Sequence, residues 1–137
     1  MATQVGSVGT VKILLDTNTL VRLHTNSSKL GKLARRRIEE APDVYYSPLS
    51  IFELIQKETL RAHLVADFMA ATRKLGLTEL PLSVDAAVEA RSFGSLRGRD
   101  PIDLLMLSQA TFQKAVLLTS DMELLGLGLS FVLDSTE

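Results

Sequence analysis

Short apolar runs alternate with amphipathic segments along most of the chain. Five runs have the length and aliphatic content of buried strands: residues 11–15, 44–46, 77–82, 115–118 and 130–133. Pro81 shortens the third run, which suits the edge of a sheet because proline cannot donate to a strand ladder.

Between these runs, apolar residues recur at helical spacing. The segments are 19–24, 30–40, 48–59, 60–75, 84–91, 102–114 and 122–125. Ser47 and Ser83 can cap two of these helices, and Pro48 suits a first helical position. The helix over 102–114 is apolar on nearly every side, so we expect it to be buried. The Gly- and Arg-containing stretch 94–99 is predicted to be a loop.

Strands that alternate with helices predict an α/β fold, with a mainly parallel sheet of four to five strands between two layers of helices. No repeat or linker divides the sequence. We therefore expect one domain over residues 11–137, preceded by a flexible polar tail over residues 1–10.

Composition narrows the function classes. The 137 residues include no cysteine, which excludes disulfides, thiolate metal sites and a cysteine nucleophile and suits a reducing cytoplasm. No apolar run approaches the roughly 20 residues that span a bilayer, and the start lacks a signal-peptide layout. His24 and His63 match no metal-ligand spacing, and no phosphate-binding glycine loop or nucleophile elbow occurs.

Two aspartates directly follow predicted strands. Asp16 comes after the first strand and Asp121 after the fourth. Ligands of open parallel sheets bind at the carboxyl ends of strands, so neighbouring strands would bring both carboxylates into one crevice. The alternative is that each aspartate only caps a helix or starts a turn.

Further acids lie on predicted helices. Glu53 is flanked by apolar residues, so it is either partly buried or paired with Lys57 at i,i+4. Asp100, with Pro101 after it, forms a good helix start. Capping explains Asp103 less fully, because the helix it begins carries no further charge until Lys114.

Asp16, Glu53, Asp103 and Asp121 have no basic residue directly beside them in sequence. Clustered carboxylates repel one another and therefore need protons or cations. Because the ligand set contains only oxygen, it selects hard ions such as Mg²⁺ or Mn²⁺.

Four motifs resemble those of the PIN domain: ILLDTN (13–18), LSIFEL (49–54), RDPIDLLMLSQA (99–110) and LLTSD (117–121). The likeness spans about residues 11–134 and is nearest to the VapC-type toxins of bacterial VapBC toxin–antitoxin pairs. It implies a PIN-like three-layer fold and a catalytic set of Asp16, Glu53, Asp103 and Asp121, of which the three aspartates bind metal. Supporting positions by the same resemblance are Thr17, Asp100 and Ser120.

The resemblance also implies the activity and the partners. The expected enzyme is a Mg²⁺- or Mn²⁺-dependent endoribonuclease that is blocked by a cognate antitoxin and forms a homodimer. Arg97 and Arg99 are our candidates for phosphate contact. Two positions depart from the subgroup: Gly98 replaces a frequent histidine and Leu104 a frequent arginine, neither of them a metal ligand in the family.

Three other functions remain open at this point. The first is a PIN nuclease that processes ribosomal or transfer RNA without an antitoxin. The second is a PIN-like module that binds RNA or protein without cutting. The third, a phosphatase of the haloacid-dehalogenase type, requires a second acid two residues after the first, where this chain has Asn18.

Overall fold

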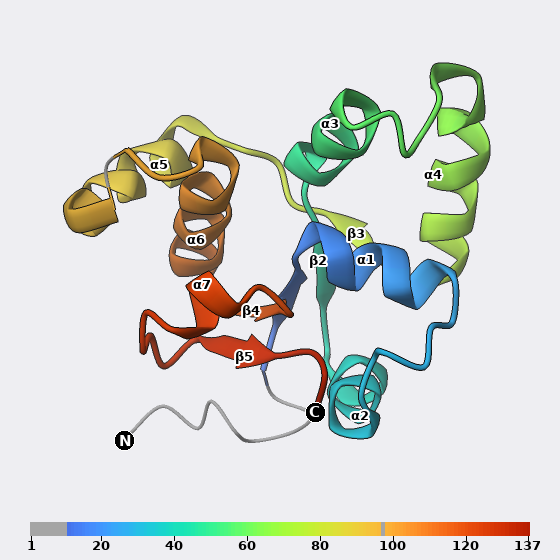
Figure 1. Ribbon diagram of the computed structural model, residues 1–137, viewed down its shortest axis with the longest axis horizontal. Coiled ribbons are helices and arrows are strands. Elements are labelled where there is room, and N and C mark those ends of the chain that lie inside the picture. The colour runs from blue at the N-terminus through green and yellow to red at the C-terminus, as the bar shows by residue number, and fades with distance from the viewer. Residues whose placement is uncertain (1–10, 97) are drawn as a thin grey trace.

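A five-stranded sheet forms the centre of the computed structural model, which describes residues 11–96 and 98–137. Figure 1 shows the sheet between two groups of helices. All neighbouring strands are parallel, and the order is β3-β2-β1-β4-β5. The strands are β1 (Ile13–Leu15), β2 (Val44–Tyr46), β3 (Thr78–Glu79), β4 (Val116–Thr119) and β5 (Val132–Asp134). The predicted α/β class is confirmed, with β3 at an edge. The tail predicted for residues 1–10 lies outside the described residues.

The helices connect the strands in the predicted alternation. They are α1 (Thr17–His24), α2 (Lys32–Glu40), α3 (Pro48–Gln56), α4 (Val65–Lys74), α5 (Val84–Val88), α6 (Pro101–Gln113) and α7 (Met122–Leu125). Within residues 11–96 and 98–137, no helix is long and apolar enough to cross a membrane.

Two 3-10 segments differ from the prediction. The first, η1 (Ala62–Leu64), precedes α4, so residues 60–75 do not form one continuous helix. The second, η2 (Glu89–Leu96), extends into the predicted loop. This 3-10 helix is interrupted at Phe93, whose φ of −115° and ψ of 37° are not helical. Phe93 and Leu96 are both buried in the core, and this burial keeps the segment against the domain.

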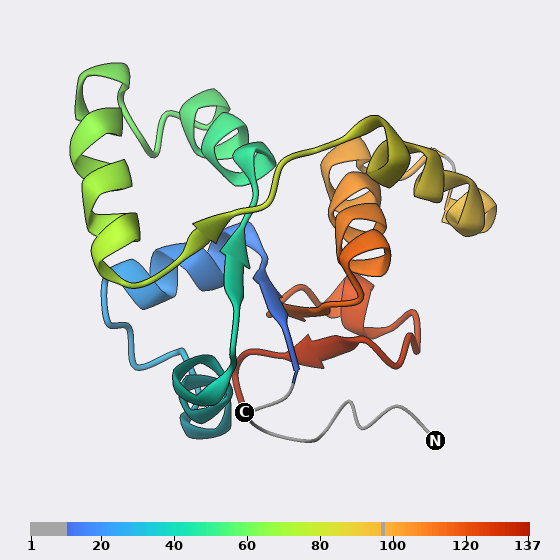
Figure 2. The same ribbon diagram turned by 180° about the vertical axis from the view of Figure 1, so that it is seen from behind.

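The sheet separates two hydrophobic clusters because successive strand residues point to opposite faces. On one face, Leu14 and Leu117 pack with residues of η2, α6 and α7. On the other face, Ile13, Leu15 and Leu118 pack with residues of α1, α2 and α4. Figure 2, the reverse view, shows the same two groups of helices. Both faces of the central strands are therefore covered.

The strand order reverses at the centre of the sheet. From β1 the chain proceeds to β2 and β3 on one side, then returns to place β4 and β5 on the other side. The registers Ile13↔Val116 and Leu15↔Leu118 align the ends of β1 and β4. A reversal of this kind opens a crevice at the carboxyl ends of the strands, where ligands of such sheets bind.

Candidate active site

Asp16 lies at this edge of the sheet, directly after β1. It is the N-cap of α1, and its Oδ1 accepts a hydrogen bond from the Thr17 backbone N–H at 2.8 Å. Its Oδ2 accepts a hydrogen bond from the Thr119 hydroxyl at 2.6 Å, and the residue is only 6% exposed. The cap predicted as an alternative role for Asp16 is thus present, and the capping carboxylate is buried rather than in solvent.

Thr119 joins the two aspartates that follow the central strands. Besides donating to Asp16, its hydroxyl oxygen accepts a hydrogen bond from the Asp121 backbone N–H at 3.0 Å. Asp121 is the N-cap of α7, where its Oδ1 accepts from the Glu123 N–H at 2.8 Å. Ser120, the hydroxyl residue predicted to support the site, is partly exposed, whereas the hydroxyl that contacts Asp16 belongs to Thr119, which was not predicted. A hydroxyl at the end of a central strand, two residues before Asp121, was the available signal.

Helix α3 brings Glu53 to the site from the next strand. The helix begins with Ser47 as N-cap, and the Thr17 hydroxyl donates to the Ser50 hydroxyl at 2.9 Å, which ties α1 to α3. The Glu53 side chain is 16% exposed, and its Oε2 lies 3.0 Å from Lys57 Nζ. Both predictions for Glu53, partial burial and an i,i+4 pair, therefore hold. The acidic cluster therefore has a basic partner, Lys57, which is four residues from Glu53 in sequence.

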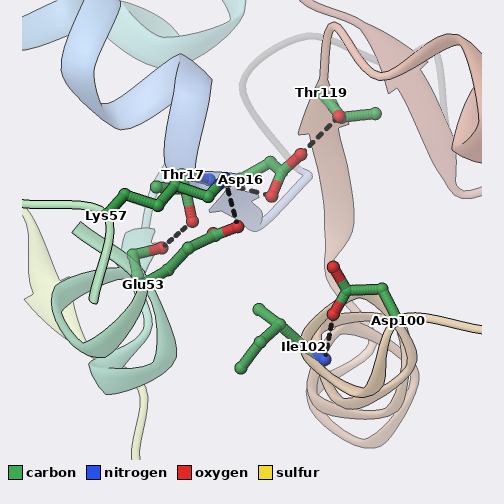
Figure 3. Close-up of polar contacts among 8 residues, drawn as sticks. Asp16, Thr17, Glu53, Lys57, Asp100, Ile102 and Thr119 are labelled. Carbon is green, nitrogen blue, oxygen red and sulfur yellow. Dashed lines mark hydrogen bonds and ion pairs between the residues drawn. The ribbon is translucent and has the colours of Figure 1, made fainter. Parts of the chain in front are cut away.

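Helix α6 supplies two more aspartates at its N-terminus. Asp100 is exposed and caps the helix, since its Oδ1 accepts from the Ile102 N–H at 2.9 Å. Figure 3 shows Asp100 turned toward Ile102, apart from Asp16 and Glu53. Asp103 follows in the first turn and is only partly exposed. The end of α6 thus supplies a cap at Asp100 and a further carboxylate at Asp103.

The predicted phosphate contacts have different outcomes. Arg99 is exposed, and its Nη1 lies 3.8 Å from Glu123 Oε2 in a long surface ion pair. Its guanidinium is consequently held only weakly and stays accessible. Arg97 lies outside the described residues.

The carboxylates act on one another electrostatically. Burial, followed by the charges of Asp16, Asp100, Asp121 and Glu53, raises the pKa of Asp103 to about 7. Burial also raises the pKa of Asp16, although its hydrogen bonds from Thr119 and Thr17 oppose that change. The charges of acids from four separate stretches of chain therefore act on Asp103.

The described residues contain no ready-made metal cluster. Within residues 11–96 and 98–137, no group of three or more Asp, Glu, His or Cys side chains stands close enough to enclose a metal ion. Mg²⁺ commonly binds through one or two carboxylates and keeps several waters, so an open set of oxygen ligands suits it. Burial and neighbouring carboxylates disfavour the bare charges of Asp16 and Asp103, so these are the two residues best suited to hold such an ion, and the three-aspartate set that the resemblance implies is not assembled among the described residues.

Solved structures share this fold at low sequence identity. VapBC-1 from nontypeable Haemophilus influenzae matches with a TM-score of 0.68 and 19% identity over 92% of this chain and 99% of that chain. DNA-bound VapBC from Salmonella typhimurium gives 0.64 and 18% over 90% and 96%. A toxin–antitoxin complex from Klebsiella pneumoniae gives 0.62 and 18% over 88% and 95%.

Comparison at the sequence level gives the family. No curated protein matches the chain. The family model of the PIN domain matches residues 13–127, which include all four acids of the candidate site. The chain therefore belongs to the PIN domain family.

Proposed function

We propose that this protein is a Mg²⁺- or Mn²⁺-dependent endoribonuclease and the toxin component of a VapBC-type toxin–antitoxin pair. The observation that carries the proposal is the shared field of Asp16, Glu53, Asp103 and Asp121 at the point where the strand order reverses. Like charges brought together without a cation are costly, whereas a divalent ion and a phosphate group make use of them.

Each acid has a role in this proposal. Asp16, Asp103 and Asp121 hold the ion directly or through water, and Glu53 completes the negative cluster. When bound, the ion supplies an acidified water and neutralises charge that develops on the phosphate. Thr119 and the Thr17 N–H orient Asp16 by hydrogen bonds to its two oxygens. Arg99, and Arg97 beside it in sequence, contact RNA phosphates.

The partners follow from the family and from its structural relatives. The Klebsiella structure is a toxin–antitoxin complex, and the match to it covers 88% of this chain. We therefore propose a cognate antitoxin that blocks the crevice, a toxin homodimer and action in the cytoplasm. The absence of cysteine throughout the sequence suits a reducing compartment.

The test measures cleavage of RNA in Mg²⁺ or Mn²⁺, with and without EDTA. The variants Asp16→Asn and Asp103→Asn are compared with Asp67→Asn, a matched control because Asp67 is an exposed acid in the first turn of α4. We expect both site variants to lose at least about 100-fold in rate, with the control unchanged. Cleavage that survives EDTA and both site substitutions would contradict the mechanism.

The antitoxin is tested separately. Expression of the wild-type chain should arrest growth, and co-expression of a small protein encoded beside it should restore growth and co-purify with the chain. A nuclease that needs no such partner would favour the alternative role in ribosomal or transfer RNA processing.

A further inference from the structure

Lys57 places a positive charge against one of the four acids of the site. It is the C-cap of α3, and its Nζ lies 3.0 Å from Glu53 Oε2. Figure 3 shows the contact between the Lys57 side chain and Glu53. The Lys57 side chain is 65% exposed whereas that of Glu53 is 16% exposed. The ammonium thus reaches a partly buried carboxylate from the solvent side.

This contact differs from the other ion pair in the described residues. Arg99 and Glu123 are 3.8 Å apart, and neither belongs to the four acids. The hydrogen bond and charge of Glu53, with a smaller contribution from the charges of Asp100 and Asp103, raise the pKa of Lys57. Among the described residues, Lys57 is therefore a cation that contacts one acid of the cluster and neutralises part of its charge.

The Lys57–Glu53 ion pair is weak enough for another cation to replace Lys57. Exposed lysine–carboxylate pairs are weak, because water screens them and the long side chain loses freedom in forming them. A divalent ion attracted by the neighbouring aspartates can therefore displace the ammonium from Glu53. The freed group stays at the rim of the crevice, and lysine binds phosphate well as a mobile point charge.

We propose that Lys57 is a substrate-binding residue, which neutralises Glu53 before the metal ion binds and contacts an RNA phosphate afterwards. This inference rests on the proposed ribonuclease function. One side chain would thus neutralise the metal-free cluster and also contribute to substrate binding.

The experiment compares wild type with Lys57→Met, Lys57→Arg and the control Lys74→Met, since Lys74 is an exposed lysine at the end of α4. Calorimetric titration with Mn²⁺ in the absence of RNA should show about 3- to 10-fold tighter binding by Lys57→Met, because the competitor for Glu53 is gone. In RNA cleavage, the same variant should raise KM about 3- to 10-fold, keep kcat within about two-fold and lower the salt slope of binding by about 1. Lys57→Arg and Lys74→Met should resemble wild type in all three measurements.

Unchanged Mn²⁺ affinity, or an unchanged KM and salt slope, in Lys57→Met would overturn the inference. Failure of the proposed function looks different, because the wild-type protein itself would then cut no RNA in Mn²⁺. In that event, binding of fluorescent single-stranded RNA by the same four proteins in Mn²⁺ replaces KM. Equal affinity and equal salt slope for wild type and Lys57→Met would then reject the role of Lys57.

Discussion

Thr119 donates a hydrogen bond of 2.6 Å to Asp16 Oδ2 across 103 residues of sequence. The same hydroxyl accepts from the Asp121 N–H, so it fixes the ends of β1 and β4 against each other. Thr119 is fully buried, and water cannot replace it as a partner. We infer that this side chain sets the orientation of Asp16.

The first prediction concerns this hydroxyl. Thr119→Val keeps the shape but removes both hydrogen bonds, which leaves Asp16 Oδ2 without its donor. Loss of an outer hydrogen-bond partner in a metal site lowers affinity or activity about 10- to 100-fold, and we expect that range for metal-dependent RNA cleavage. Thr119→Ser retains the hydroxyl and should keep most of the activity. Equal activity of the valine and serine variants would show that Thr119 only fills space.

The second prediction concerns pH and the stability of the metal-free protein. The pKa of Asp103 is about 7 in the folded chain, above its ordinary value of 3.8. Between these values the folded chain holds a proton that the unfolded chain has released, so stability falls as pH rises through about 7. Asp103→Asn has no charge to bury. In EDTA at about pH 8 it should be more stable than wild type by roughly 1–2 kcal/mol, a range reduced for solvent screening.

Urea unfolding in EDTA measures this difference. At about pH 4 the gap between Asp103→Asn and wild type should shrink, because Asp103 is then protonated in the folded chain. Asp67→Asn is the control and should show no gain at either pH, because Asp67 is exposed at the start of α4. A pH-independent difference for Asp103→Asn would mean that the stabilisation has another cause.

The third prediction concerns addition and removal of metal. A ligand that binds only the folded state stabilises it by about 2.7 kcal/mol at 100 times its Kd. Mn²⁺ should therefore raise the melting temperature of wild type, and EDTA should reverse the gain. Asp16→Asn should lose most of this response while Asp67→Asn keeps it. A similar shift in both variants would place the ion elsewhere on the molecule.

The class of fold and the meeting of Asp16 and Asp121 at one edge of the sheet could be predicted from the sequence. Aliphatic runs of strand length indicated a parallel sheet, and the rule for the carboxyl ends of strands brought Asp16 and Asp121 to one edge. These inferences succeed because they depend on periodicity and on positions next to strands. The pairing of Glu53 with Lys57 was also accessible, since it needs only i,i+4 spacing on one helix.

Other features depend on contacts that local pattern does not encode. The partner of Thr119 is 103 residues away, and that of the Thr17 hydroxyl, Ser50, is 33 residues away. Their meeting requires the strand order, which periodicity does not give. The 3-10 helix η2 was not predicted for a related reason. It is stabilised by burial of Phe93 and Leu96 against distant residues. The sequence pattern thus indicates which acids belong to the site, whereas tertiary packing determines how they are oriented.

The last prediction tests such a distant contact at Gly31, the N-cap of α2, which has no side-chain cap. Instead, the Gly31 N–H donates to the Ser135 carbonyl at 2.9 Å and the Leu33 N–H to the Glu137 carbonyl at 2.7 Å. A Cβ on Gly31 would collide with the backbone of Glu137, so Gly31→Ala must displace the segment that caps the helix. We expect a loss of about 1–3 kcal/mol in urea unfolding, as for other overpacked sites. Gly94→Ala is the control, since no atom lies within 4 Å of its added Cβ. If both variants unfold at the same urea concentration as wild type, the C-terminal residues do not stabilise α2, because the collision would have been relieved at no cost.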